Sequence, residues 1–202
     1  MNKYIYEAKT KEEAIDKALK ELNITEDNSI IRILEEKNTL LKKNVKIEVI
    51  KYNDIINYIK EVINNILNKM EIEANLEIKR REDKIDVKIF SNNNSILIGK
   101  NGKNINSLQQ IIRQILNTQI ENQILLTIDV ENYREKRDKI LENLAQKVAK
   151  EVTRTKVETK LDSMNSYERR IIHNKLTNNR SVYTESVGEE PNRCVVIKPK
   201  EE

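Results

Sequence analysis

The chain has 202 residues, 38% of them apolar and 35% charged, with a formal net charge of +4. A chain of this length forms one to two domains, or three very small ones. Its one cysteine, Cys194, excludes an intrachain disulfide and favours a reducing, cytoplasmic location. No stretch reaches the roughly 18 uncharged apolar residues of a transmembrane helix. One histidine and one cysteine leave little for a catalytic or metal centre. We therefore expect no enzyme, no metal and no cofactor.

The first fifty residues predict a β-α-β-β unit. Lys3–Ala8 is expected as a strand, and Thr10 with Glu13 forms the capping box of the helix that follows. Ile30–Glu35 and Val45–Ile50 are expected as two further strands, joined by a polar connection at Lys37–Asn44.

The middle of the chain predicts the order α-β-β-α-α-β. A helical stripe runs from Ile55 to Met70, and alternating apolar residues follow in Ile72–Ile78 and Ile85–Ile89. A short apolar turn precedes Gly99. A helix at Lys103–Asn117 and a strand at Ile124–Val130 complete this region.

The last seventy residues predict a long helix, a strand, a second helix and two strands. The long helix spans Tyr133–Thr155, with an inward stripe of Ile140, Leu141, Leu144, Val148 and Val152. A strand at Val157–Met164 precedes a capping box of Asn165 and Glu168. The helix that follows ends near Leu176 and is expected to bury Tyr167, Ile171, Ile172 and Leu176. Val182–Ser186 and Cys194–Lys198 are expected as strands.

These patterns predict an α+β protein of three small domains. We place the domains at residues 1–50, 51–131 and 132–202, from the changes in periodicity. The first two regions carry no net charge, so the whole positive excess lies in the third. Two windows, Val87–Ile120 and Arg169–Thr184, contain no acidic residue. Basic windows without carboxylates are typical of a surface that binds a polyanion, although chance spacing gives the same pattern.

The first of these windows holds a Gly-x-x-Gly turn, at Gly99, Lys100, Asn101 and Gly102, followed by Lys103. Glycine lets the backbone approach a sugar-phosphate chain, and the helix that begins here offers unpaired N–H groups and two lysines. Following two strands and opening a helix, the turn fits the nucleic-acid-binding KH fold. The alternative is an ordinary corner between two helices.

The second window begins with Arg169 and Arg170 and contains His173. Arg169 and His173 lie four residues apart and therefore share one helical face. Arginine binds phosphate bidentately, and imidazole adds a hydrogen bond. These residues predict a second phosphate contact; the alternative is a packed histidine whose ring is satisfied by a backbone carbonyl.

These motifs resemble the bacterial Jag family, also called KhpB or EloR. The resemblance covers nearly the whole chain. It rests on Leu97–Gly102 and Leu108–Gln110 in the middle region, and on Met164–His173, Ser186–Arg193 and Val195–Ile197 in the last. In the first region the family's glycine-rich, aromatic-containing turn is replaced by Asn38–Asn44, which has neither residue type.

The resemblance implies a Jag N-terminal domain, a type II-like KH domain and a C-terminal domain named for its Arg-x-x-x-His motif. It implies a cytosolic RNA-binding regulator linked to cell elongation, division or envelope homeostasis. It also implies pairing with a second, small KH-domain protein or a second copy. Gly99, Lys100, Asn101, Gly102, Lys103, Arg169, Arg170 and His173 are the expected nucleic-acid contacts.

The sequence is consistent with two hypotheses about the function. In the first, the middle and last domains bind single-stranded RNA or single-stranded DNA. In the second, the charge-neutral first domain docks to envelope or membrane-insertion machinery, and RNA binding is secondary.

Overall fold

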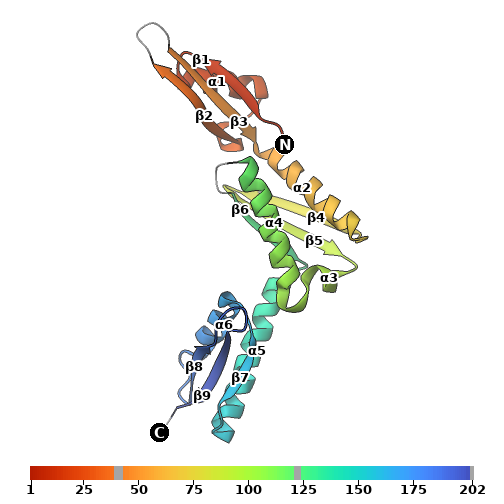
Figure 1. Cartoon of the computed structure of the whole chain (residues 1–202), viewed down its shortest axis with the longest axis vertical. Coiled ribbons are helices and arrows are strands. Elements are labelled where there is room, and N and C mark those ends of the chain that lie inside the picture. The colour runs from red at the N-terminus through yellow and green to blue at the C-terminus, as the bar shows by residue number, and fades with distance from the viewer. Residues whose placement is uncertain (39–42, 121–123, 201–202) are drawn as a thin grey trace. The chain divides into compact units, whose positions relative to one another are not determined.

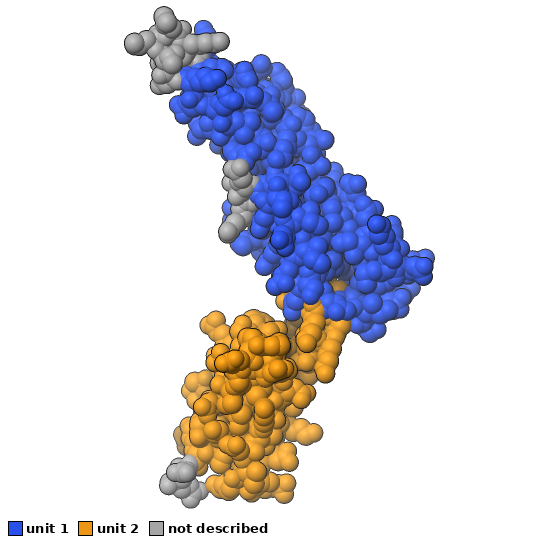
Figure 2. Space-filling view, viewed as in Figure 1, with its two compact units in different colours: residues 1–97, 104–128 blue, residues 98–103, 129–202 orange. Residues whose placement is uncertain are grey.

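The structure is a computed structural model that describes residues 1–38, 43–120 and 124–200 (Figure 1). The predicted α+β class is confirmed. The chain divides into two compact units (Figure 2). The first consists of residues 1–97 and 104–128, and the second of residues 98–103 and 129–202. The Gly-x-x-Gly turn is therefore grouped with the C-terminal part of the chain, not with the helices and strands that precede and follow it.

The N-terminal domain is a three-stranded antiparallel sheet with one helix packed on it. The sheet has the order β1-β3-β2. Its helix begins as predicted, because the Thr10 hydroxyl accepts a hydrogen bond from the Glu13 backbone N–H at 3.2 Å. Small side chains at Ala14 and Ala18 let the helix lie close to the apolar face of β3. The elements are β1 (Tyr4–Ala8), α1 (Lys11–Leu22), a 3₁₀ turn (Glu26–Asn28), β2 (Ser29–Asn38) and β3 (Lys43–Lys51).

The two long strands extend beyond their predicted ends, and β2 contains an irregularity of register between Ile33 and Glu35. Part of the predicted polar connection at Lys37–Asn44 is thus strand. Residues 39–42, at the centre of that connection and of the turn without glycine, lie outside the described residues.

The middle region has the predicted order α-β-β-α-α-β, with a three-stranded sheet ordered β4-β5-β6. The alternating residues of the second strand, Ile85, Val87 and Ile89, are at most 1% exposed. The helix predicted to end at Asn117 continues to Gln119. The elements are α2 (Tyr52–Lys69), β4 (Ala74–Arg81), β5 (Lys84–Ser91), α3 (Asn94–Ile98), α4 (Lys103–Gln119) and β6 (Leu125–Val130).

No linker separates the first domain from the second, because α2 begins at the residue after β3 ends. Arg80, near the end of β4, joins the two domains. Its guanidinium lies 3.5 Å from the ring centroid of Tyr52, and its Nη1 donates to the Asn28 side chain at 2.8 Å. The Tyr52 hydroxyl in turn donates to Asp83 at 2.9 Å. Stacking and hydrogen bonding by one arginine thus connect the first domain to the β4–β5 hairpin.

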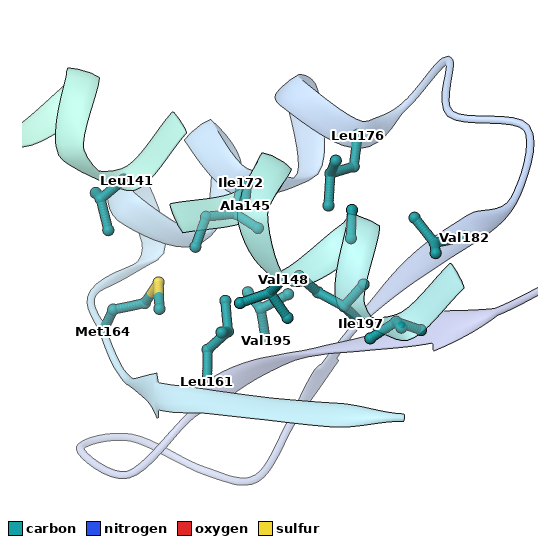
Figure 3. Packing of buried hydrophobic residues seen from close by; sticks show 12 residues of the cluster. Leu141, Ala145, Val148, Leu161, Met164, Ile172, Leu176, Val182, Val195 and Ile197 are labelled. Carbon is teal, nitrogen blue, oxygen red and sulfur yellow. The ribbon is translucent and has the colours of Figure 1, made fainter. Parts of the chain in front are cut away.

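The C-terminal domain packs two helices on a sheet ordered β7-β9-β8. Figure 3 shows its core, in which Leu141 and Val148 from the long helix and Ile172 from the second helix meet strand residues such as Val195. The elements are α5 (Tyr133–Thr155), β7 (Thr159–Ser163), α6 (Ser166–Leu176), β8 (Val182–Val187) and β9 (Cys194–Pro199).

The predicted inward face of α5 is wrong at two positions. Ile140 and Leu144 are 56% and 37% exposed, whereas Ala145 and Ala149 are buried. The sequence pattern favours the largest aliphatic residues as the buried face, whereas two alanines form the close contact in this core.

The predicted burial of Tyr167 on α6 is also wrong, since this side chain is 57% exposed. Its hydroxyl instead donates to Asp138 of α5 at 2.9 Å. Ile172 and Leu176 of the same helix are buried as predicted, and Ile171 is partly buried against the core.

Candidate nucleic-acid interface

The Gly-x-x-Gly turn is a strained backbone segment between α3 and α4. Gly99 has φ 68° and ψ 179°, a region open in practice only to glycine. Asn101 has φ 53° and Gly102 has φ 75°, both left-handed. A hydrogen bond from the Gly102 N–H to the Gly99 carbonyl, at 3.3 Å, closes the turn. The sequence therefore places glycine at the two positions where this backbone requires it.

The turn presents positive charge at the start of a long helix. Lys100 and Lys103 are exposed, Asn101 is half-buried, and α4 begins at Lys103. The Asn104 side chain donates to the Ile96 carbonyl at 2.7 Å and so ties the first turn of α4 to α3. The first N–H groups of a helix favour an anion, and two lysines beside them add to that preference.

Tyr133, the first residue of α5, lies against this turn and was missed by the sequence reasoning. A Cβ built on Gly102 would lie 2.9 Å from Cε1 of Tyr133 and 3.2 Å from its hydroxyl oxygen. The tyrosine ring thus occupies the space that any side chain at position 102 would need. Tyr133 is 31 positions away in sequence, and no pattern in the sequence points to this contact.

Arg169 lies on α6, as predicted, but it is only 7% exposed. Its Nη2 donates to Oε1 of Glu190 at 2.7 Å, while its Nε is buried without a hydrogen-bond partner among the described residues. Glu190 belongs to the loop between β8 and β9, and its side chain is 59% exposed. The guanidinium is therefore held by the domain and reaches a carboxylate at the surface.

His173 lies between two hydroxyl groups of β8. Its Nδ1 is 2.6 Å from Oγ1 of Thr184, and its Nε2 is 2.8 Å from Oγ of Ser186. Burial lowers the pKa of His173 below its usual 6.5, and the charge of Arg169 lowers that pKa further. The ring is neutral at pH 7, so one nitrogen donates and the other accepts. The ring is thus packed, as in the alternative, but its partners are two hydroxyl groups and not a backbone carbonyl. A contact between His173 and nucleic acid stays a prediction.

The window from Arg169 to Thr184 holds no acidic residue in sequence, but acidic side chains from other parts of the domain lie beside it in space. Glu190 comes to Arg169 from 21 positions away. Lys175 pairs at 2.6 Å with Glu142 of α5. Arg170 is exposed near the middle of α6. The second predicted contact surface is thus a buried, paired arginine beside an exposed one.

Within the described parts of the chain, no group of histidine, cysteine and carboxylate side chains could hold a metal ion. No helix among those residues is long and apolar enough to cross a membrane.

Three domain families match the chain. Residues 6–51 match the Jag N-terminus, residues 56–128 match the KH domain of KhpA and KhpB, and residues 139–199 match the R-three-H domain, the family named for the Arg-x-x-x-His motif. RNA-binding protein KhpB of Clostridium symbiosum is 37% identical over 96% of this chain and 90% of that protein. RNA-binding protein KhpB of Bacillus subtilis is 32% identical over 94% of each. The chain belongs to the KhpB family.

The family assignment confirms the predicted three-domain composition and the predicted resemblance.

The KhpB protein of Streptococcus pneumoniae is 29% identical over 88% of this chain but only 52% of its own length. None of the three matching domain families is an enzyme family, in agreement with the predicted class. The domain limits near residues 51 and 132 stay predictions.

The first testable prediction concerns the ionisation of His173. Because it is the chain's one histidine, its ring signals in NMR are unambiguous, and we expect them to titrate below pH 6.5. Between the lowered pKa and 6.5 the unfolded chain binds more protons than the folded chain. The free energy of unfolding should therefore be highest above pH 6.5 and fall as the pH decreases through that window.

His173→Gln serves as the control, because it removes this titration and leaves the carboxyl groups unchanged. The difference between the two unfolding free energies should change with pH only across the histidine window. A titration midpoint at or above 6.5 in the free protein would contradict the buried, neutral ring.

Proposed function

We propose that this protein is a single-stranded RNA-binding regulator that holds the RNA backbone at the Gly99–Lys103 turn and at Arg169. The observation that carries the proposal is the turn itself. Its strained glycine backbone exposes two lysines where a 17-residue helix begins. KH domains clamp the nucleic-acid backbone with such a turn, and both full-length relatives named above are called RNA-binding proteins.

At the turn, affinity comes from electrostatics and not from base recognition. Lys100 and Lys103 lie in the window between Val87 and Ile120 that holds no acidic residue. The backbone N–H groups at the start of α4 add fixed partial positive charge. Phosphate contacts of this kind position the strand and carry no sequence information themselves.

At α6, a phosphate group takes the place of the Glu190 carboxylate. Arg169 is preorganised, since burial and the ion pair fix its side chain. Glu190 is exposed on a loop and can move away, and a phosphate offers the same acceptor geometry to the guanidinium. Arg170, exposed on the same helix, adds a second cation.

Two linked contact surfaces compensate for weak individual ones. The chain has seven tyrosines, one phenylalanine and no tryptophan, so few aromatic side chains are available to stack on bases. Linking two modest sites raises overall affinity through effective concentration. We place this activity in the cytoplasm, in the regulation of cell elongation, division or envelope homeostasis, with a small KH-domain protein or a second copy as partner.

The second prediction tests the turn. Replacing Lys100 and Asn101 together with Asp should weaken RNA affinity at least about tenfold, or about 1.4 kcal/mol. The fold should survive, because Lys100 is exposed and Asp tolerates the left-handed conformation of Asn101. Fluorescence anisotropy with a labelled single-stranded RNA measures the effect.

Lys60→Asp with Asn65→Asp is the matched control, since it makes the same charge change at two exposed positions of α2. If the turn variant is folded and binds like the control, the RNA contact at the turn is refuted.

The third prediction tests the exchange of Glu190 for phosphate. Glu190→Gln removes the competing charge and should strengthen RNA binding. Arg169→Gln should weaken RNA binding and reduce the slope of log K against log salt by about 0.7 for the lost single-strand phosphate contact. Titrations at several salt concentrations measure both effects. If neither variant changes affinity, Arg169 is a structural residue only.

An adaptor role for the first domain is the second candidate function. Its sheet leaves apolar side chains exposed, with Ile5 55%, Ile33 40% and Leu34 37% accessible. Residues 1–50 have no net charge, so nucleic-acid binding does not explain them. Exposed apolar groups on such a domain favour a protein partner, here envelope or membrane-insertion machinery.

The fourth prediction concerns a truncated protein that begins at Lys51. It keeps Tyr52, which packs on Arg80 and bonds to Asp83. RNA affinity should stay within about twofold of the full chain, because the removed residues carry no net charge. In cells that lack the full-length protein, the truncated form should fail to restore function. Full complementation would refute the adaptor role.

A further inference from the structure

Tyr133 packs against the turn, and its hydroxyl has no part in the RNA contacts proposed above. Tyr133 and residues 98–103 belong to the same compact unit. The ring is half-buried, and the edge that carries Cε1 and the hydroxyl faces Gly102. The phenol oxygen therefore lies beside the strained backbone on which we place the RNA phosphate.

This hydroxyl has no hydrogen-bond partner among the described residues. Other tyrosines of the chain donate to carboxylates at 2.9 Å, Tyr52 to Asp83 and Tyr167 to Asp138. The oxygen is not among the buried atoms that lack a partner, so it reaches solvent, where a ligand can replace water as its acceptor. At Tyr133 the position of that acceptor is open.

The surroundings of Tyr133 favour an anionic acceptor. Burial raises the pKa of Tyr133, so the hydroxyl stays protonated and able to donate at neutral pH. The charges of Arg137 and Arg134 act on the same phenol in the opposite direction. The nearby acid, Glu168, is paired with Arg137 at 2.8 Å. Exposed Lys100 adds a further cation at the turn.

We propose that Tyr133 is part of the nucleic-acid site, where its hydroxyl donates a hydrogen bond to the phosphodiester held by the Gly99–Lys103 turn. The inference rests on the proposed function and adds to it a residue outside the KH domain's own motif. The close packing of the ring also assigns a second role to Gly102. A side chain there would displace the ring as well as strain the backbone.

The test compares Tyr133→Phe with the unaltered full-length protein. This variant keeps the ring and its packing on Gly102 and removes only the hydroxyl. Affinity for a labelled single-stranded RNA of about 16 nucleotides should fall about three- to tenfold, the range expected for the net loss of one hydrogen bond at a site that solvent also reaches. The salt slope should not change, because a hydroxyl displaces no counterion. A variant that instead displaced the lysines would lower the slope.

Tyr167→Phe is the matched control, since it removes a tyrosine hydroxyl elsewhere in the same unit and should leave RNA affinity unchanged. Tyr133→Ala reports on the ring. If Tyr133→Phe binds like the unaltered protein while Tyr133→Ala binds weakly, the ring only supports the turn and the inference is overturned. The inference also fails if both Tyr133 variants bind normally while the Lys100/Asn101 double variant is weak. If the double variant also binds normally, it is the proposed function at the turn that fails.

Discussion

The buried carboxylate of Glu168 is the interaction on which the C-terminal unit depends. It is 4% exposed, accepts a hydrogen bond from Arg137 of α5, and accepts another from the Asn165 N–H. It therefore caps α6 and fixes α6 to α5 at the same point. A buried carboxylate without these partners would be strongly destabilising, so the pair specifies one arrangement of the two helices.

That arrangement connects the two candidate contact surfaces through one face of α5. Tyr133, Arg137 and Leu141 are spaced four residues apart and lie one above another. The first packs on Gly102 of the turn, the second pairs with Glu168, and the third enters the core. Arg169 follows Glu168 directly, so the carboxylate that caps α6 also positions the arginine. A rigid support of this kind holds cationic groups where a flexible loop could not.

The sequence was sufficient for the elements because their signals are local. Both predicted N-caps placed helix starts correctly, at Thr10 and Asn165, and alternation identified the strands of the middle region. The errors arose where burial depends on a neighbour. Ala145 and Ala149 face the core because close packing there needs small side chains, and Tyr167 is exposed because Asp138 supplies a partner for its hydroxyl. The hydrophobic pattern of one helix does not show which side chains of a neighbouring element it will contact.

The candidate site shows the same limit more sharply. Glycine spacing identified the turn, since strained backbone at Gly99 and Gly102 must be encoded by those residues themselves. The environment of Arg169 could not be found this way, because a window free of acids in sequence is not free of acids in space. Glu190 lies on the β8–β9 loop and forms an ion pair with Arg169, although no acidic residue is close to Arg169 in the predicted basic window. Electrostatic potential depends on distance between charges and not on their order in the chain. Any anion that binds the buried guanidinium of Arg169 must therefore compete with a carboxylate of the same domain.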